Sequence, residues 1–153
     1  MASTLKVKIQ EEIVLDNQNY SSKRVLEISS INEISKRILT ITTTEAEILK
    51  FASTIDAGRY IIGDVRYMRF TNLDDTNFIT LTFTNEDSDE VAIKLDAGQS
   101  FIWNGDNNGG LVDSFNAVTA GNAASDTALA DVTGVQADAN TGSCDLEMFI
   151  ASV

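Results

Sequence analysis

The sequence predicts an all-β protein, an antiparallel β-sandwich with a jelly-roll-like architecture. Two observations support this prediction. Apolar and polar residues alternate along much of the chain, with the period of two that is expected of half-buried strands. Clusters of Asn, Asp and Gly interrupt this alternation every 8–12 residues or so. Strands with such spacing are typical of sandwiches and jelly rolls, and we expect about eight of them.

The first part of the chain contains three predicted strands. Apolar residues alternate with Lys and Gln in a first strand that begins at residue 5 and continues toward residue 15. The Asn- and Asp-rich residues 16–19 predict the turn that follows. A second strand is expected over residues 23–28, and a third over residues 37–44, where the sequence RILTITTT is rich in β-branched residues.

The next segment, residues 45–51, is compatible with two structures. It contains helix formers, and Thr44 could cap a short helix, but Ile48 and Phe51 also fit a strand. We expect a strand here. A turn at residues 55–58 leads into a further short strand at residues 59–62.

The clearest alternation lies in residues 65–103, which we interpret as an antiparallel β-meander. In residues 79–83 the apolar side chains alternate with Thr, and residues 91–95 repeat the pattern. Asn- and Asp-rich turns separate the apolar runs. This region therefore predicts strands that pair with their neighbours in the chain.

The segment after Trp103 has a different character. Residues 104–143 are rich in Gly, Asn, Asp, Ala and Thr, so we expect surface loops with weak strands near 112–118 and 128–135. Alternation returns in residues 145–153, which predict a last strand that closes the sheet. With 43% hydrophobic residues, the whole chain, 1–153, is expected to form a single domain with a substantial core.

The composition argues against most enzyme classes. There is no histidine, which removes the commonest general base and the partner that usually activates a serine or cysteine nucleophile. Cys144 is the only cysteine, so it has no internal disulfide partner and is predicted to be a small, buried strand residue. We therefore predict a protein without catalytic activity.

The charge is strongly negative and unevenly distributed. Residues 1–70 hold ten basic and nine acidic side chains, a net charge of +1, whereas residues 71–153 hold one basic and fourteen acidic side chains, a net charge of −13. Such a chain offers no basic surface for nucleic acid or for an anionic membrane, so we predict neither as a partner. The acidic half is interpreted as a solvated face or as the outward side of a polarised assembly protein.

We expect no signal peptide or membrane span. The first residues contain no apolar run of the length that a signal peptide requires, and nowhere do about 18 apolar residues run together. These features favour synthesis in a cytoplasm.

Acidic turns provide weak candidates for a calcium site. Asp74, Asp75, Asp87, Asp89 and Asp106 supply the hard oxygen ligands that Ca²⁺ prefers. None of their surroundings has the EF-hand spacing, and Asp in hairpin loops commonly serves the turn itself. Paired carboxylates could also hydrolyse glycosides, although hairpin tips are poorly placed for that chemistry. No other cofactor is predicted.

Four aromatic residues have two interpretations. Tyr60, Tyr67, Phe101 and Trp103 could form a platform for a sugar ring. Aromatic residues at alternating strand positions are more often part of a core or of a subunit interface, and we favour that interpretation.

Two short motifs carry a resemblance to a known group of proteins. Residues 69–75 read R-x-x-N-L-D-D and residues 95–101 read L-x-A-G-x-S-F, with the intervening 78–83 strand between them. The pattern resembles that of small β-sandwich virion proteins of tailed bacteriophages, especially marine ones, and covers about a quarter of the chain. Similar phrases occur in cupin-like proteins, but the absence of histidine rules out the metal site of that family.

The resemblance implies a structural role in a virus particle. The chain would be a capsid decoration (cement) protein that binds and stabilises a phage head through multivalent subunit contacts. Its partners would be the major capsid protein or tail subunits, together with further copies of itself as a homo-oligomer. It would be made in the host cytoplasm and displayed on the virion. Two alternatives stay open: a phage tail accessory or fibre component, and a carbohydrate-binding β-sandwich module.

Overall fold

The computed structural model describes residues 2–117 and 129–153, which form strands and a single 3₁₀ turn, η1. In chain order the elements are β1 (Ser3–Glu11), β2 (Val14–Leu15), β3 (Gln18–Asn19), β4 (Ser22–Ile31), β5 (Glu33–Ile41), β6 (Ala46–Ala52), β7 (Tyr60–Ile61), η1 (Ile62–Asp64), β8 (Val65–Asn72), β9 (Ile79–Asn85), β10 (Glu90–Leu95), β11 (Ser100–Asn104), β12 (Val132–Ala139) and β13 (Cys144–Ser152). Among these residues no helix is long and apolar enough to cross a membrane.

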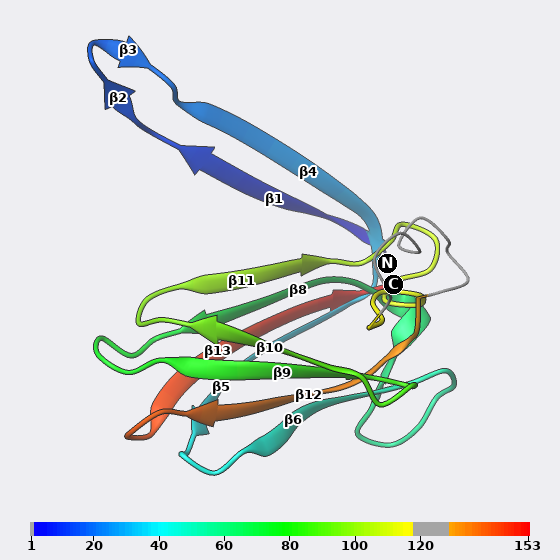
Figure 1. Cartoon of the computed structure of the whole chain (residues 1–153). Coiled ribbons are helices and arrows are strands. Elements are labelled where there is room, and N and C mark those ends of the chain that lie inside the picture. Colours follow the sequence, from blue (N-terminus) through cyan, green and yellow to red (C-terminus); the bar gives the residue numbers. More distant parts are fainter. Residues whose placement is uncertain (1, 118–128) are drawn as a thin grey trace.

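Two sheets pack face to face and form the body of the molecule (Figure 1). The five-stranded sheet has the order β10-β9-β12-β6-β7, and the four-stranded sheet has the order β11-β8-β13-β5. All pairs are antiparallel except the short β6–β7 pair. The two sheets contain eight strands of five or more residues, and most connections between these strands cross from one sheet to the other, which is the winding of a jelly roll. The predicted all-β sandwich is confirmed.

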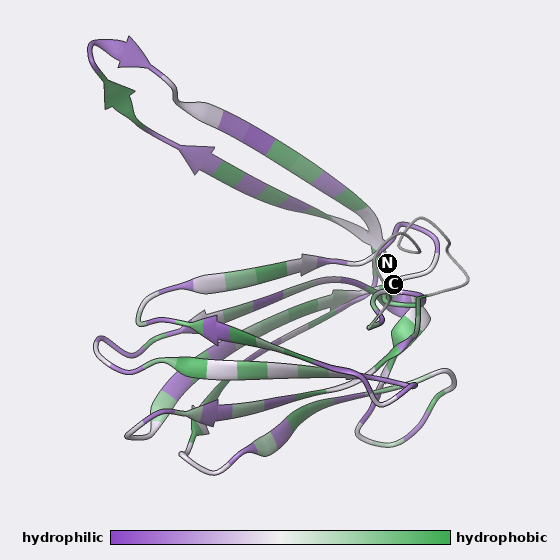
Figure 2. Ribbon diagram, in the orientation of Figure 1, coloured by the Kyte–Doolittle hydropathy of each residue, from purple (hydrophilic) through white to green (hydrophobic). Residues whose placement is uncertain are grey.

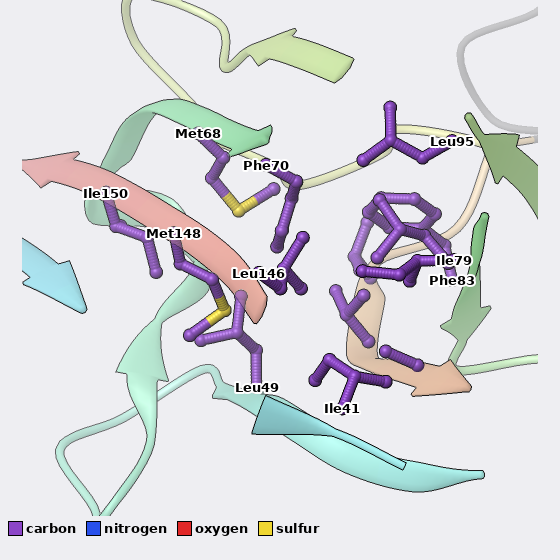
Figure 3. Packing of buried hydrophobic residues seen from close by; sticks show 14 of the residues in the cluster. Ile41, Leu49, Met68, Phe70, Ile79, Phe83, Leu95, Leu146, Met148 and Ile150 are labelled. Carbon is purple, nitrogen blue, oxygen red and sulfur yellow. The ribbon is translucent and has the colours of Figure 1, made fainter. Parts of the chain in front are cut away.

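The hydrophobic core lies between the two sheets and explains the alternation in the sequence (Figure 3). In β13, Leu146, Met148 and Ile150 are buried. Phe83 of β9 packs edge-to-face against Phe70 of β8, with 6.0 Å between ring centroids. Burial of each large side chain of this kind is worth about 1.5–3 kcal/mol.

The prediction of a continuous meander over residues 65–103 is wrong. Only β9 and β10 form a hairpin with each other, whereas β8 and β11 pair in the opposite sheet. Asn72 holds the two crossover loops together, because its buried side-chain amide donates to the carbonyls of Asn77 (2.8 Å) and Leu95 (3.1 Å). Alternation shows which side chains are buried, but it does not distinguish a hairpin from a crossing between sheets.

The structure also refines the predicted loop segment 104–143. β12 lies in the middle of the five-stranded sheet, between β9 and β6, where a weak strand was expected at residues 128–135. Its inward side chains include Ala137 and Ala139, which lie opposite Leu81 and Ile79 in the sheet. Small inward residues make the alternation of apolar and polar residues weak, so the sequence predicts β12 only as a weak strand.

The other weak strand, expected near residues 112–118, is a turn region in its described part. Residues 112–117 contain one isolated bridge, from Phe115 to Ala130, and residue 118 lies outside the described residues.

Other expected strands are present with shifted bounds or places. Residues 45–51 form a strand, β6, as expected, while the third predicted strand is β5 and begins at Glu33. The last strand, β13, is central in its sheet and does not close an edge, because β5 pairs on its far side. Cys144 is free and buried at the start of β13, as predicted.

One feature of the chain was not expected. Within the part of the chain that the structure describes, β1 and β4 pair only with each other, and they leave the sandwich as a long hairpin at the end where both termini lie (Figure 1). The first predicted strand breaks after Glu11, and β2 and β3 form the end of the hairpin. Asp16 and Asn17 make the turn there, with φ of 50° and 61°, as their residue types favour. We call residues 3–31 the arm.

Candidate interaction surface

The arm is a two-stranded ribbon with one apolar face. Leu5 pairs with Ile28 and Val7 with Leu26, so these four side chains share a face, which Ile9 extends. The opposite face is mainly charged. Figure 2 shows the resulting bands of apolar and polar residues along both strands. A ribbon with one apolar face needs a surface to cover that face, because an isolated hairpin is marginally stable in water.

The root of the arm is covered by the sandwich. A second apolar cluster joins Ile28 and Ile31 of the arm to Tyr67 of β8 and Ala151 of β13. Tyr67 packs edge-to-face on Phe149, with 5.9 Å between the ring centroids. At the junction with β5, the Asn32 N–H donates to the Ser152 carbonyl at 2.9 Å. The root is therefore part of the folded body.

The outer part of the arm has no such cover. Twelve large apolar residues are exposed in the described part of the chain. Seven of them lie in the arm, although the arm makes up only about a fifth of the sequence. These seven are Ile9, Ile13, Val14, Leu15, Tyr20, Val25 and Leu26. Clustered exposed apolar residues of this kind usually mark an interaction site.

The tip of the arm, residues 11–22, is apolar and acidic, and local hydrogen bonds close its turn. Val14 has 69% of its surface exposed, the highest value in the tip among the large apolar residues. The Tyr20 N–H donates to the Ile13 carbonyl (3.0 Å), and the Ser21 hydroxyl accepts from the Ile13 N–H (3.1 Å). The tip contains three acidic residues and no basic one. These acidic residues are Glu11, Glu12 and Asp16.

The outer face of the four-stranded sheet is a second exposed apolar area. Ile34 and Ile38 of β5 lie on this face, and 49% and 59% of their surfaces are exposed. Glu147 of β13 lies beside them and bonds both Lys36 (3.0 Å) and Arg69 (2.6 Å). Hydrogen bonds from Lys36 and Arg69 lower the pKa of Glu147, so this carboxylate is firmly ionised.

A groove separates the arm from this outer face. It has a volume of about 300 Å³ and runs between the apolar face of β1 and the strands β8, β11 and β13. Apolar side chains line it from both sides. The lining residues are Leu5, Lys6, Val7, Lys8, Ile9, Tyr67, Arg69, Ile102 and Phe149. Lys6 and Lys8 alternate with the apolar residues of β1 and lie on the other face of the ribbon, and Arg69 is paired with Glu147, so the groove is mainly apolar.

Charge separates the arm from the rest of the chain. Residues 1–31 contain four basic and four acidic side chains, which cancel, whereas residues 32–153 contain seven basic and nineteen acidic ones. The second part thus carries the whole net charge of −12. Two such bodies repel each other at low ionic strength, and a neutral arm is the part that approaches another copy most easily.

On the polar face of the arm, Lys6 and Glu27 form an exposed ion pair of 2.8 Å. The hydrogen bond between them raises the pKa of Lys6 and lowers the pKa of Glu27. This pair links β1 to β4 across the ribbon and keeps that face hydrophilic.

The acidic calcium candidates serve as turn residues in the structure. The Asp74 Oδ1 accepts from the N–H groups of Asn77 (2.6 Å) and Thr76 (2.8 Å). The Asp106 Oδ1 accepts in the same way from Asn108 (2.7 Å) and Gly109 (3.0 Å). These backbone hydrogen bonds lower the pKa of both carboxyl groups.

Of the remaining acidic candidates, Asp75 lies in the same turn as Asp74, whereas Asp87 and Asp89 lie between β9 and β10. Asp75 bonds the hydroxyl of Thr76, while Asp87 and Asp89 accept from Asn116 and Ala117 at 3.0 Å each. Within residues 2–117 and 129–153 no three Asp, Glu, His or Cys side chains come together as metal ligands would. The structure does not bring the five candidates into one site.

The aromatic candidates for a sugar platform are also separated. Phe101 and Trp103 pack onto Phe83 on the core side of β11, with 5.5 and 5.0 Å between ring centroids. Tyr67 lies on the opposite face of the same sheet, under the arm, and Tyr60 packs near Phe51. These side chains pack within the protein, which is the interpretation that we favoured.

Sequence reasoning missed the arm and its exposed apolar side chains. Residues 5–9 and 25–28 alternate like any other strand, and their charges resemble those of an ordinary surface. The available signal was the balance of charge, because residues 1–31 are neutral in a strongly acidic chain. Three consecutive apolar residues, 13–15, directly before a predicted turn were the other signal.

Comparison with known protein families and with curated proteins finds no match to the chain. Among solved structures, the chain is similar to one described as "Bacillus endospore appendages form a novel family of disulfide-linked pili". The alignment covers 100% of this chain and 90% of that one, at 10% identity and a TM-score of 0.40. At these values the similarity carries no argument about function.

Proposed function

We propose that this protein is a non-enzymatic structural subunit that attaches to its neighbours in a larger particle through the arm. The observation that carries the proposal is the concentration of exposed apolar side chains on a neutral arm that projects from an acidic body. The sandwich is the stable platform, and the arm supplies the contact.

The physical properties of the arm suit this role. β1 has nine residues and spans about 30 Å, so the tip reaches well beyond the sandwich. Among the described residues no third strand pairs with the ribbon, so the outer edge of each of its strands can pair with a strand of a neighbour. Contacts of this size are individually weak, but many copies on one particle make the attachment firm.

The particle that we propose is a bacteriophage virion, with the chain as a capsid decoration protein on the head. The resemblance of residues 69–75 and 95–101 to phage virion proteins supports this placement. The acidic body would face solvent, where like charges keep decorated particles apart. Partners of the arm would be the major capsid protein and further copies of the chain.

The test is cosedimentation of the purified protein with purified heads of a tailed phage through a sucrose cushion. A tip variant, Val14→Ser with Leu15→Ser, removes two apolar side chains that are exposed in the isolated protein. We expect the wild type to sediment with the heads and the tip variant to stay in the supernatant. Ile55→Ser is the matched control, because Ile55 is 89% exposed but lies outside the arm.

Two outcomes contradict the proposal. Equal sedimentation of the tip variant and the wild type would show that the arm does not make the attachment. A wild type that never sediments with heads, while retaining its folded circular dichroism spectrum, would reject the virion placement.

A further inference from the structure

We propose that the edge strand β5 pairs with β5 of a second copy of this chain. The two strands run antiparallel around a two-fold axis at Ser35, so that the four-stranded sheets of the two copies join into one continuous sheet. The inference goes beyond the proposed function, because the arm takes no part in this contact. A separate surface on the body of the protein supplies it.

β5 is the longest edge strand of the two sheets. It has nine residues, whereas the other edge strands, β10, β11 and β7, have six, five and two. Its pairing with β13 is regular over residues 33–41, without a bulge that would bend the edge away from a partner. Among the described residues no strand pairs on its outer side. Such an edge offers a row of backbone donors and acceptors to another strand.

The side chains on the outer face of β5 favour contact with a partner. Outside the arm, the described part of the chain has five exposed large apolar residues, and two of them, Ile34 and Ile38, lie on this face. Lys36 lies between them and is paired with Glu147 at 3.0 Å. The positive charge that would keep another strand away from the edge is therefore compensated within the same sheet.

Opposite charges on the other face of β5 select a second copy as the partner. Glu33 and Arg37 are both exposed, and both line an open cleft of about 470 Å³. Neither forms an ion pair within the described part of the chain. In an antiparallel pair centred on Ser35, Glu33 of each copy lies opposite Arg37 of the other. Two ion pairs then form across the axis.

The charges also determine the register. With the outer faces of both sheets on one side, a pair centred on Lys36 or on Arg37 would place that residue opposite its own copy, where like charges repel. A pair centred on Ile38 would place Glu33 and Arg37 opposite uncharged residues. The register centred on Ser35 gives both charges a partner.

The net charge of the protein does not oppose this contact. Residues 32–52, which include β5 and β6, contain three basic and three acidic side chains. Residues 53–153 contain four basic and sixteen acidic ones, which account for the whole net charge of −12. The strand that we propose as the contact therefore lies in a neutral part of an acidic chain.

Pairing through β5 would place two arms on the same side of the dimer. The two-fold axis is perpendicular to the joined sheet, so the outer faces of both copies point in one direction. The root of each arm packs on that face, where Tyr67 contacts Phe149. A dimer would thus present two arms to one surface and would bind it more firmly than a single copy.

The test reverses the two charges one at a time. Glu33→Arg brings two basic side chains together at each crossing, and Arg37→Glu brings two acidic ones together. In size-exclusion chromatography with light scattering, we expect the wild type to reach twice the 16.6 kDa chain mass by about 1 mM. Each variant should dimerise about tenfold more weakly. In an equimolar mixture opposite charges meet again, so heterodimers should form with the strength of the wild type.

Matched controls address charge, folding and the arm. Glu90→Arg and Lys94→Glu make the same changes of charge on β10, at the edge of the other sheet, and should dimerise like the wild type. Each variant must retain the circular dichroism spectrum and cooperative unfolding of the wild type. The series is repeated with Val14→Ser and Leu15→Ser in every chain, so that contacts of the arm tip do not enter the result.

Disulfide trapping tests the register. Ser35→Cys places two thiols directly opposite each other, at the Cα separation of about 4.5–5.5 Å that a disulfide can span. Thr40 lies five residues from the axis in each copy, so the thiols of Thr40→Cys would be about 33 Å apart. Under mild oxidation we expect a covalent dimer from the Ser35 variant and a monomer from the Thr40 variant. Cys144 is buried and should not cross-link.

Several results would overturn the contact. These are a wild type that stays monomeric up to about 1 mM, single charge variants that dimerise like the wild type, and a mixture that dimerises no better than its components. Equal cross-linking of the Ser35 and Thr40 variants would reject the register. None of these results depends on whether the arm binds phage heads, so failure of this inference and failure of the proposed function are distinguishable.

Discussion

The sandwich and the arm use the same alternating strand pattern, but different surfaces cover their apolar faces. In the sandwich each apolar face is buried by the opposite sheet, and Phe83, Phe70 and Leu146 have no exposed surface. In the arm the apolar face is buried at the root and exposed toward the tip. The comparison shows that alternation marks an apolar face but does not indicate whether the same chain covers it.

The largest expected effect tests the sandwich as the source of stability. Phe83→Ala removes a side chain at the centre of an aromatic cluster and should lower the free energy of unfolding by about 3–5 kcal/mol. Val14→Ser in the arm should change it by less than about 0.5 kcal/mol, because Val14 is exposed. Urea denaturation of the two variants measures both values, and similar losses would contradict the division between body and arm.

The next prediction concerns the junction between the two regions. Tyr67→Ala removes the ring that packs on Phe149 beneath the arm and should cost about 2–4 kcal/mol in local or global stability. Limited proteolysis should then cut β1 or β4 at least tenfold faster, while fragments of the sandwich persist. Unchanged cleavage would show that the root cluster does not hold the arm.

The sequence predicted the sandwich better than the arm for a physical reason. The strands β9, β10 and β13 follow directly from alternation, since their inward side chains are large and their turns rich in Asn, Asp or Gly. The assignment of β8 and β9 to different sheets depends on how loops cross the core, which side-chain periodicity does not encode. β12 was underestimated because Ala137 and Ala139 are small.

The candidate site was predicted less well than the fold. The acidic turns were predicted as calcium candidates because carboxylates bind metals. In the structure, Asp74 and Asp106 accept hydrogen bonds from local backbone N–H groups instead. The arm was not recognised because an apolar strand face looks the same in sequence whether its cover is in the same chain or in another. Only the three-dimensional arrangement shows that β1 and β4 pair with each other and with no other strand of residues 2–117 and 129–153.

A smaller effect is expected at the crossover loops of the sandwich. Asn72→Ala leaves the carbonyls of Asn77 and Leu95 without their side-chain donor and should lower stability by about 1–3 kcal/mol. Thermal unfolding followed by circular dichroism gives the value. Asn116→Ala is a suitable control, because its amide makes an exposed contact with Asp87. If Asn72→Ala lowers stability no more than Asn116→Ala does, the Asn72 side chain does not hold the two crossover loops together.

The smallest expected effect is a pH dependence at the outer face of the four-stranded sheet. The pKa of Glu147 is lowered in the folded protein by Lys36 and Arg69, so its contribution to stability is present above its ordinary pKa. That contribution is lost as the pH falls through the lowered value. Urea unfolding from pH 7 to pH 3 should therefore show a shallower loss of stability for Glu147→Gln than for the wild type. Parallel pH profiles would contradict the ion-pair assignment.

The most direct test of the central claim is hydrogen exchange measured by mass spectrometry, on the dilute monomer and on the assembled protein. We predict that amides in the outer part of the arm, residues 8–24, exchange rapidly in the monomer and become protected on assembly. Peptides from β9, β12 and β13 should be protected equally in both states. Protection that appears on the five-stranded sheet and leaves the arm unchanged would contradict the account.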